Sequence, residues 1–265
     1  MKKMVYLILL FSFVKCSSSK SVADANSRSA TKEYYTLQVY HLDNNDQVAL
    51  VDNFLKSAWL PALHRQGITK VGVFKPVTND TAVDKRIIVF TPFTSLQQFE
   101  KTTLQLQRDI TLEQQSPAYV NAPYNSPPYN RFETILVHAF DQMPAMDVPR
   151  LTGPRASRIY ELRSYEGPTE KLYRNKVQMF NEGGEVALFK RLNFNAVFYG
   201  SVLAGSRMPN LIYMTTFENM ADRDAHWKTF SDDPEWKVLA AKPEYQNNVS
   251  RNDTQLLTPT EYSDF

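Results

Sequence analysis

Hydrophobic and polar residues alternate in short runs along this chain, and between the runs apolar residues recur at helical spacing. Residues 34–41 alternate and predict a strand. The segment after it predicts a helix that stops at Gly67, because its apolar residues are Val48, Val51, Leu55, Trp59 and Leu63. The same reading predicts strands at 69–77 and 85–91, a helix at 96–108, an irregular proline-rich stretch at 114–130 and a strand at 132–140.

A second set of apolar segments repeats the first at a constant offset of 124 to 125 residues. Residues 35–40 align with 160–165, and the other aligned pairs are 71–77 with 196–202 and 87–93 with 211–217. A fixed offset across three segments indicates two copies of one domain of ordinary size. In the second copy we predict strands at 158–165, 194–203, 211–217 and 254–259, with helices at 169–192 and 221–230.

Each copy therefore has the order strand, helix, strand, strand, helix, strand, written βαββαβ, which is typical of ferredoxin-like α+β domains. We place the first domain at 32–142, a proline-rich linker at 143–156 and the second domain at 157–265. Helices cover one face of such a sheet, so the other face needs a different partner. We expect the two sheets of this chain to cover each other.

Strand alternation divides the first strand of each copy into two faces. We assign Tyr160, Leu162 and Ser164 to the helix-covered core, together with the matching residues of the first copy, Tyr35, Leu37 and Val39. The face between the sheets then carries Glu161, Arg163 and Tyr165, matched by Thr36, Gln38 and Tyr40. Buried charges must be paired or line a wet cavity, so this face predicts either a structural ion pair or a ligand pocket.

The first sixteen residues have the pattern of an export signal, with Lys2 and Lys3 before a short apolar run. Cys16 ends that run and is the only cysteine, which predicts a lipoprotein signal at 1–16 and a flexible, polar tether at 17–31. An ordinary cleaved signal remains the alternative, because Lys15 stands where a small residue is usual. Either reading predicts an exported protein of the cell envelope, and the first adds a membrane anchor through Cys16.

Charge and composition exclude several classes of function. Removal of residues 1–15 takes the formal net charge from +2 to about −1. A near-neutral chain without a block of basic residues has no footprint for nucleic acid. Beyond Cys16 no thiol is left for a disulfide or a catalytic nucleophile, and the four histidines follow no ligand pattern, so we expect no metal and no cofactor.

The second copy resembles the NIPSNAP family of the dimeric alpha-beta barrel superfamily. The residues that carry the resemblance lie at 160–165, 183–184, 194–200, 211–217, 222–227, 233–236 and 257–263. The resemblance implies that tandem ferredoxin-like halves close into a barrel within the chain, as a pseudo-dimer that can assemble further. It implies no established catalytic mechanism. The first copy lacks the Gly183-Gly184 pair and has Gln38 in place of Arg163, which is typical of a degenerate half.

These observations predict a binding module for a small aromatic or anionic ligand in the barrel interior. The candidate ligand-binding residues are Glu161, Arg163, Tyr165, Tyr199, Tyr213, His226, Gln38 and Tyr40. Arg163 can hold a carboxylate by two hydrogen bonds. Two other readings stay open: an oxygenase-like enzyme, by analogy with other members of the superfamily, and a surface for a protein partner at the envelope.

Overall fold

A computed structural model describes residues 31–265, so the predicted signal, the tether and Cys16 lie outside the described residues, apart from Thr31. Residues 31–265 form one compact unit. None of their helices is long and apolar enough to cross a membrane. The strands are β1 Tyr34–Leu42, β2 Gly72–Pro76, β3 Lys85–Phe93, β4 Arg131–Ala139, β5 Ile159–Glu166, β6 Phe198–Ala204, β7 Asn210–Phe217 and β8 Arg251–Pro259.

The eight strands form a closed barrel in the order β1-β3-β2-β8-β5-β7-β6-β4. Within residues 31–142 the strands lie in the order β4-β1-β3-β2, and within residues 157–265 the corresponding strands lie in the same order, β8-β5-β7-β6. The two sheets join where β2 pairs with β8, at Phe74 and Pro259, and where β4 pairs with β6, at Val137 and Val202. The barrel therefore closes within this chain, and the α+β class and the barrel agree with the prediction.

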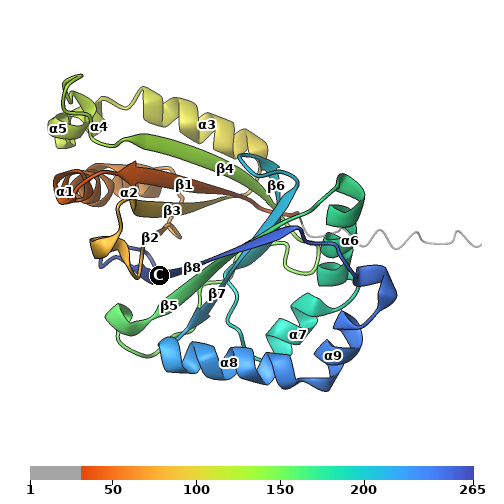
Figure 1. The fold of residues 1–265 in the computed structure, drawn as a ribbon. Helices are drawn as coiled ribbons and strands as arrows, with labels where there is room; N and C mark the ends of the chain where they lie inside the picture. Colours follow the sequence, from red (N-terminus) through yellow and green to blue (C-terminus); the bar gives the residue numbers. More distant parts are fainter. Residues whose placement is uncertain (1–30) are drawn as a thin grey trace, which may run out of the picture. The chain divides into compact units, whose positions relative to one another are not determined.

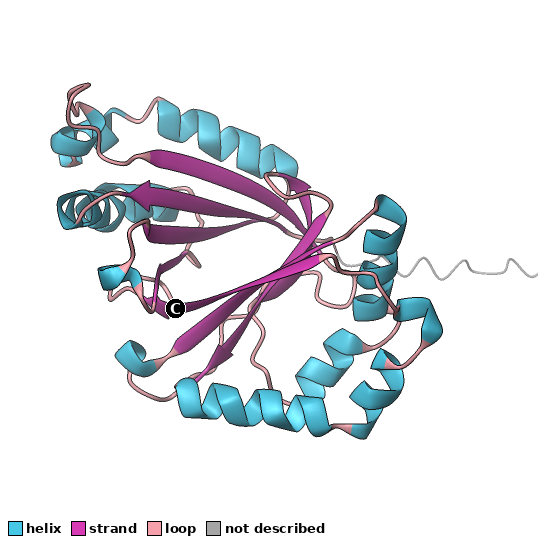
Figure 2. Cartoon of the chain, viewed as in Figure 1, coloured by secondary structure: helices cyan, strands magenta, loops and turns pink. Residues whose placement is uncertain are grey.

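The helices lie on the outside of the barrel (Figure 1). Those of the first half pack on β1, β2 and β3, and those of the second half pack on β5, β6 and β7 (Figure 2). Their bounds are α1 Asn45–Phe54, α2 Leu60–Arg65, α3 Leu96–Gln107, α4 Ile110–Gln115, α5 Pro117–Val120, α6 Glu170–Asn181, α7 Glu185–Arg191, α8 Met220–Asp232 and α9 Pro234–Ala240. A π-helical turn, Leu55–Trp59, makes α1 and α2 continuous.

Side-chain caps begin several helices, including the one that the sequence predicts at 96–108. Ser95 accepts a hydrogen bond from the Gln98 amide at 3.1 Å, and Asp233 accepts one from the Glu235 amide at 2.9 Å. Two predictions were wrong. The stretch at 114–130 is not wholly irregular, since it contains α5 and the end of α4, and the helix at 169–192 is broken in two at Gly184, which has φ +94°.

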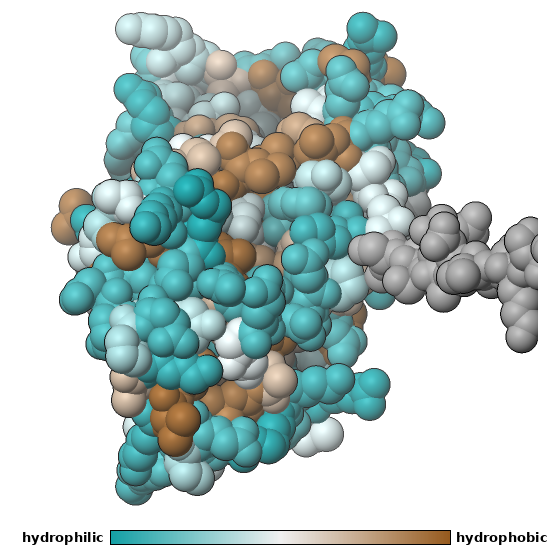
Figure 3. All heavy atoms as spheres, turned by 90° about the vertical axis from the view of Figure 1, so that its right-hand side faces the viewer, coloured by the Kyte–Doolittle hydropathy of each residue, from teal (hydrophilic) through white to brown (hydrophobic). Residues whose placement is uncertain are grey.

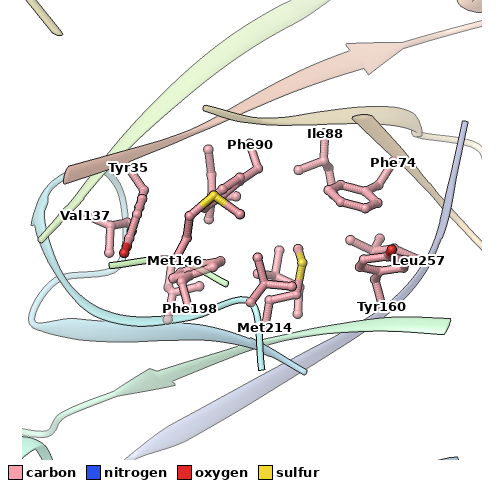
Figure 4. Close-up of a cluster of buried hydrophobic side chains, with 14 of the residues drawn as sticks. Tyr35, Phe74, Ile88, Phe90, Val137, Met146, Tyr160, Phe198, Met214 and Leu257 are labelled. Atoms are coloured by element: carbon pink, nitrogen blue, oxygen red, sulfur yellow. The ribbon is translucent and has the colours of Figure 1, made fainter. Parts of the chain in front are cut away.

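The barrel interior is an apolar core built from both halves. Its members include Tyr35 and Leu37 of β1 and Tyr160 and Leu162 of β5. Figure 4 shows Tyr35 and Tyr160 among side chains of both halves, and their rings contact Phe198 and Phe74 of the opposite halves at centroid distances of 5.2 and 4.8 Å. We assigned these four residues to the helix-covered core, and this assignment was wrong. Both faces of each sheet are buried, so alternation separates two faces without saying which one the helices cover.

The linker closes one end of the barrel. Met146 and Leu151, both from the segment predicted as a linker, belong to the interior core, and so does the C-terminal residue Phe265. Phe265 packs against the rings of Phe74 and Tyr160 at centroid distances of 5.9 and 6.2 Å. This end is therefore filled by side chains, whereas the end at which β1 and β5 finish retains a cavity.

Candidate functional site

Glu161 is the centre of a charged cluster on the helix-covered side of β5. Its side chain has no exposure to solvent. One carboxylate oxygen accepts hydrogen bonds from Arg163 Nε at 2.6 Å and Arg223 Nη2 at 3.1 Å. The other accepts from Arg223 Nε at 2.7 Å and Trp227 Nε1 at 2.8 Å. Burial alone raises the pKa of Glu161, but the Arg223 hydrogen bonds and the Arg163 charge outweigh it and hold the pKa below its usual value.

Helix α8 supplies two of these partners. Asn219 caps its start by accepting a hydrogen bond from the Asp222 amide at 3.0 Å. Arg223 and Trp227 follow four residues apart, so they lie one turn apart on the same helix face and both reach Glu161. The cluster therefore depends on a strand and a helix that are about sixty residues apart in the chain.

Arg163 is held flat between several groups. Its guanidinium carbon lies 3.8 Å from the centroid of the Trp227 ring, a cation–π contact. Its Nη1 donates to the Tyr165 hydroxyl at 2.9 Å, and that hydroxyl bonds to the Tyr213 hydroxyl at 2.9 Å. Burial disfavours the charged form of Arg163, but its interactions with the Tyr213 and Tyr165 hydroxyls and with the Glu161 carboxylate raise its pKa above the usual range, so the guanidinium stays charged.

A second ion pair borders the same space. Lys176 Nζ of α6 lies 2.9 Å from Glu185 Oε2 of α7, and both side chains are buried. The break at Gly183 and Gly184 ends α6 and begins α7 at Glu185, which brings this carboxylate back to Lys176. Burial raises the pKa of Glu185, and the adjacent Lys176 opposes that rise only in part.

These groups surround an open pocket of about 410 Å³ between β5 and the four helices of the second half. Three cationic side chains and one carboxylate line it, and aromatic rings form its walls. The lining residues are Arg163, Tyr165, Lys176, Glu185, Phe189, Arg223, Trp227, Phe230, Ser231 and Trp236. Such a pocket can bind an anion and stack an aromatic ring.

The structure puts the predicted polar face on the opposite side of the sheet from the one we expected. Glu161, Arg163 and Tyr165 point toward the helices and not into the barrel. The prediction was wrong because the residues that pair with Glu161 come from α8, and strand alternation alone does not reveal them.

The other predicted ligand-binding residues divide by location. Tyr213 contacts Tyr165 beneath the pocket, and Tyr199 stacks on Tyr213 at 5.5 Å in the same helix-side core. Burial raises the pKa of both phenols well above its usual range, so both are neutral. Gln38 and Tyr40 lie on the helix side of the first half, and not in the barrel interior, so they are far from this pocket in sequence and in the fold.

His226 is outside the pocket lining. Its Nδ1 lies 2.8 Å from the Asp222 carbonyl oxygen, and its ring packs against Phe194 and Phe217. Within residues 31–265 no group of three or more potential ligand side chains is arranged to hold a metal ion.

Sequence reasoning missed Arg223, Lys176 and Glu185. A signal for Lys176 was present, since it shares a helix face with Met179 and Phe180 three and four residues later. A lysine on an apolar helix face needs a partner. Arg223 precedes Trp227 by one turn, but nothing in the sequence joins it to Glu161.

Comparison with known proteins relates the fold to several solved structures. A protein of Lactobacillus acidophilus proposed to be a monooxygenase superimposes with a TM-score of 0.55 at 10% identity, covering 86% of this chain and 94% of its own. An anthrone oxidase-like protein gives 0.51 at 10% identity, covering 88% and 93%. At these identities the similarity shows a common fold, the ferredoxin-like dimeric alpha-beta barrel, and no more.

The family comparison concerns the second half. Residues 160–264 match the NIPSNAP family. A NIPSNAP-like domain protein of Burkholderia xenovorans is 21% identical over 41% of this chain and 90% of its own, with a TM-score of 0.37. No curated protein matches the chain. All residues of the Glu161 cluster and its pocket fall within residues 160–264, the part of this chain that matches the NIPSNAP family.

Proposed function

We propose that the NIPSNAP domain binds a small aromatic carboxylate in the helix-side pocket. The observation that carries this proposal is the position of Arg163, which Glu161 orients from one side and Trp227 from one face. The described residues use its Nε and one hydrogen of Nη1, so three of its five N–H donors are available to a ligand. A guanidinium that is already oriented binds a carboxylate with little loss of side-chain entropy.

The charge of the lining favours an anionic ligand. Arg163, Lys176 and Arg223 line the pocket with a single carboxylate, Glu185, whereas Glu161 and Asp224, which also pair with Arg223, lie outside the lining. The aromatic walls favour a flat ligand, because Trp227 and Trp236 present ring surface to the pocket. Both preferences are met by a fused-ring carboxylate.

Calorimetric titration of the purified full-length protein with 2-naphthoate tests the proposal. We expect Arg163→Ala to weaken binding by about tenfold or more, since it removes the charged hydrogen bonds to the ligand. Arg65→Ala is the matched control, because Arg65 pairs with Asp109 in the first half. Unchanged affinity in Arg163→Ala would exclude the proposed site.

A ligand-side control avoids any effect of the substitution on folding. The uncharged analogue 2-naphthamide keeps the ring and loses the negative charge. We expect it to bind wild-type protein at least about tenfold more weakly than 2-naphthoate. Equal affinity would mean that the cationic lining does not select the ligand.

A second candidate function is oxidation of an anthrone-type substrate by molecular oxygen. It is supported by the fold shared with proteins named as monooxygenase and oxidase, and by the hydrogen-bonded chain from Arg163 through Tyr165 to Tyr213. A neutral phenol held by a guanidinium can donate a hydrogen bond to a substrate oxygen. In this reaction the substrate loses two hydrogens and gains one oxygen atom, and the other oxygen atom leaves as water.

Oxygen consumption with anthrone distinguishes this candidate from simple binding. If the protein catalyses this oxidation, oxygen consumption should be faster than the spontaneous rate without protein, and slower with Tyr165→Phe than with wild type. A rate equal to that without protein would remove the candidate and leave the binding proposal in place.

We also infer that the two halves are copies of one domain. The same strand order in both halves supports this, and so does the position of matched residues: Ile88 and Ile212, 124 residues apart, both belong to the interior core. When residues 157–265 are produced alone, β6 and β8 lose their partner strands β4 and β2. We therefore expect this fragment to form a dimer, which sedimentation velocity would detect. A stable monomer would contradict this inference.

The location at the cell envelope is likewise a proposal. It is supported by the basic start, the short apolar run and Cys16 in residues 1–16. Cell fractionation of the wild type and of Cys16→Ala tests it: we expect the substitution to move the protein from the membrane fraction to the soluble fraction.

A further inference from the structure

A second cavity, of about 320 Å³, lies inside the barrel at the end where β1 and β5 finish. Alternation along these strands continues the interior face of Tyr35 and Tyr160 into the cavity wall. Its apolar wall comes from β1, β3 and β4 of the first half and from β5 and β7 of the second half. The residues are Leu37, Val39, Ile88, Ile135, Leu162 and Ile212. Four of these wall residues, Leu37, Ile88, Leu162 and Ile212, also belong to the interior core, whose aromatic side chains Figure 4 shows.

The mouth of this cavity is polar, and its charges are paired. His41 lies 2.9 Å from Asp84 and 3.3 Å from Glu133. Arg86 pairs with Asp84 at 2.8 Å.

The second half contributes a similar arrangement. Arg207 pairs with Asp253 at 3.0 Å. Two arginines, Arg86 and Arg207, and two carboxylates, Glu133 and Asp253, line the cavity, so neither sign of charge is in excess. A charged ligand gains no net attraction here, in contrast to the helix-side pocket.

Neutral hydrogen-bonding groups lie just inside the mouth. Ser164 donates to the Asn210 side-chain oxygen at 3.0 Å, and both residues line the cavity. The nitrogen of the same amide can donate to a ligand, and the Ser164 oxygen can accept from one. Asn210 is almost fully buried, so its orientation is fixed by the surrounding barrel.

The size of the cavity suits one small molecule. An apolar cavity of about 150 Å³ stays dry and binds benzene, and this cavity has about twice that volume. Barrels of eight strands are just wide enough to be filled by side chains or to hold one small ligand. Here one end of the barrel is filled, and the other end keeps space for a ligand.

We propose that the barrel interior binds one small uncharged, mainly apolar molecule with a hydroxyl or amide end. The apolar body lies against the aliphatic wall, and the polar end lies beside Ser164 and Asn210. This site shares no lining residue with the helix-side pocket and lies on the other face of the sheet. It is therefore independent of the function proposed above.

Fluorescence titration with 2-naphthol tests the proposal on the full-length protein, because the probe is uncharged at neutral pH and has the required shape. Val39→Trp places a large ring in the cavity from a partly buried position of β1. We expect this variant to bind 2-naphthol at least about tenfold more weakly than wild type, and Arg163→Ala to bind it with unchanged affinity.

The outcomes separate the two sites. If wild-type protein does not bind 2-naphthol, or if Val39→Trp binds it as well as wild type does, the barrel site is excluded. Loss of 2-naphthol binding in Arg163→Ala with retention in Val39→Trp would assign the probe to the helix-side pocket and overturn the proposal. If circular dichroism shows that Val39→Trp does not fold, Ile135→Phe, which narrows the cavity from β4, replaces it. We expect this variant also to bind 2-naphthol at least about tenfold more weakly than wild type.

Discussion

The two halves of the barrel use the helix-covered face of the same strand in different ways. In the second half this face of β5 carries Glu161 and Arg163, and Arg163 lines a charged pocket. In the first half the matching positions of β1 are Thr36 and Gln38, with Tyr40 after them. The backbone arrangement is equivalent, so the difference lies in what the covering helices contribute.

The helices of the first half fill the space with apolar and aromatic side chains. Phe54 of α1 stacks on Tyr119 of α5 at 3.7 Å, and Tyr40 packs against Tyr129 at 5.7 Å. The second half instead places Arg223 and Lys176 over the sheet. One fold thus supports a packed core in one half and a charged pocket in the other, and the pocket requires every buried charge to be paired.

The side of the molecule that carries α6 and α9 is largely hydrophilic with separate hydrophobic patches (Figure 3). The contrast between the halves lies beneath the helices, so substitutions at buried positions test it best.

Removal of the central carboxylate is expected to have the largest effect. Glu161→Ala leaves Arg163 and Arg223 without their shared partner, and breaking a buried pair in this way costs about 3–5 kcal/mol of unfolding free energy. The matched change Thr36→Ala in the first half is expected to cost about 1 kcal/mol. Urea denaturation measures both, and equal losses would show that the two positions do not differ energetically.

The pH dependence of stability should separate Glu161 from Glu185. The pKa of Glu161 is lowered in the folded protein, so between that value and its usual value of 4.5 the unfolded state binds more protons. Its stabilising contribution is present above pH 4.5 and is lost as the pH falls below it.

Glu185 acts in the opposite direction. Its pKa is raised in the folded protein, so the folded state binds more protons and stability falls as the pH rises above 4.5. Urea denaturation midpoints, measured from acid to neutral pH, test both assignments. As the pH is lowered, the midpoint of Glu161→Gln should decrease less than that of wild type. As the pH is raised, the midpoint of Glu185→Gln should decrease less than that of wild type. Curves parallel to wild type would contradict these assignments.

Placing the equivalents of Glu161 and Arg163 at positions 36 and 38 of the first half should destabilise the protein. Gln38→Arg is expected to lose about 1–3 kcal/mol, because the charge lies on the helix side without a carboxylate. The double variant Thr36→Glu, Gln38→Arg supplies one carboxylate but no equivalent of Arg223 or Trp227. Denaturation should show that it stays less stable than wild type; full stability would mean that a two-residue pair is sufficient.

The smallest expected effect concerns the helix break. Gly184 has φ +94°, so Gly184→Ala should cost about 1 kcal/mol. Gly67→Ala, at φ +81° after α2, should cost a similar amount. Only Gly184→Ala should also weaken 2-naphthoate binding, since it disturbs the position of Glu185. Equal binding by both variants would show that the helix break does not affect the pocket.

Much of the fold follows from the sequence pattern. Alternation predicts β1 and β5 within one or two residues, and Ser95 and Thr169 mark helix starts that the structure has. The constant offset of 124 to 125 residues predicts that the element order occurs twice. These features are local, because strand period and capping depend on neighbouring residues.

The site was only partly predictable. The sequence by itself determined that Glu161, Arg163 and Tyr165 share one face of a strand, because successive side chains point to opposite sides. The tertiary structure alone decided which side that is. Both faces of the strand are buried, and the choice follows from pairing of Glu161 with Arg223 and Trp227, which only the packing of α8 on the sheet brings within hydrogen-bonding distance.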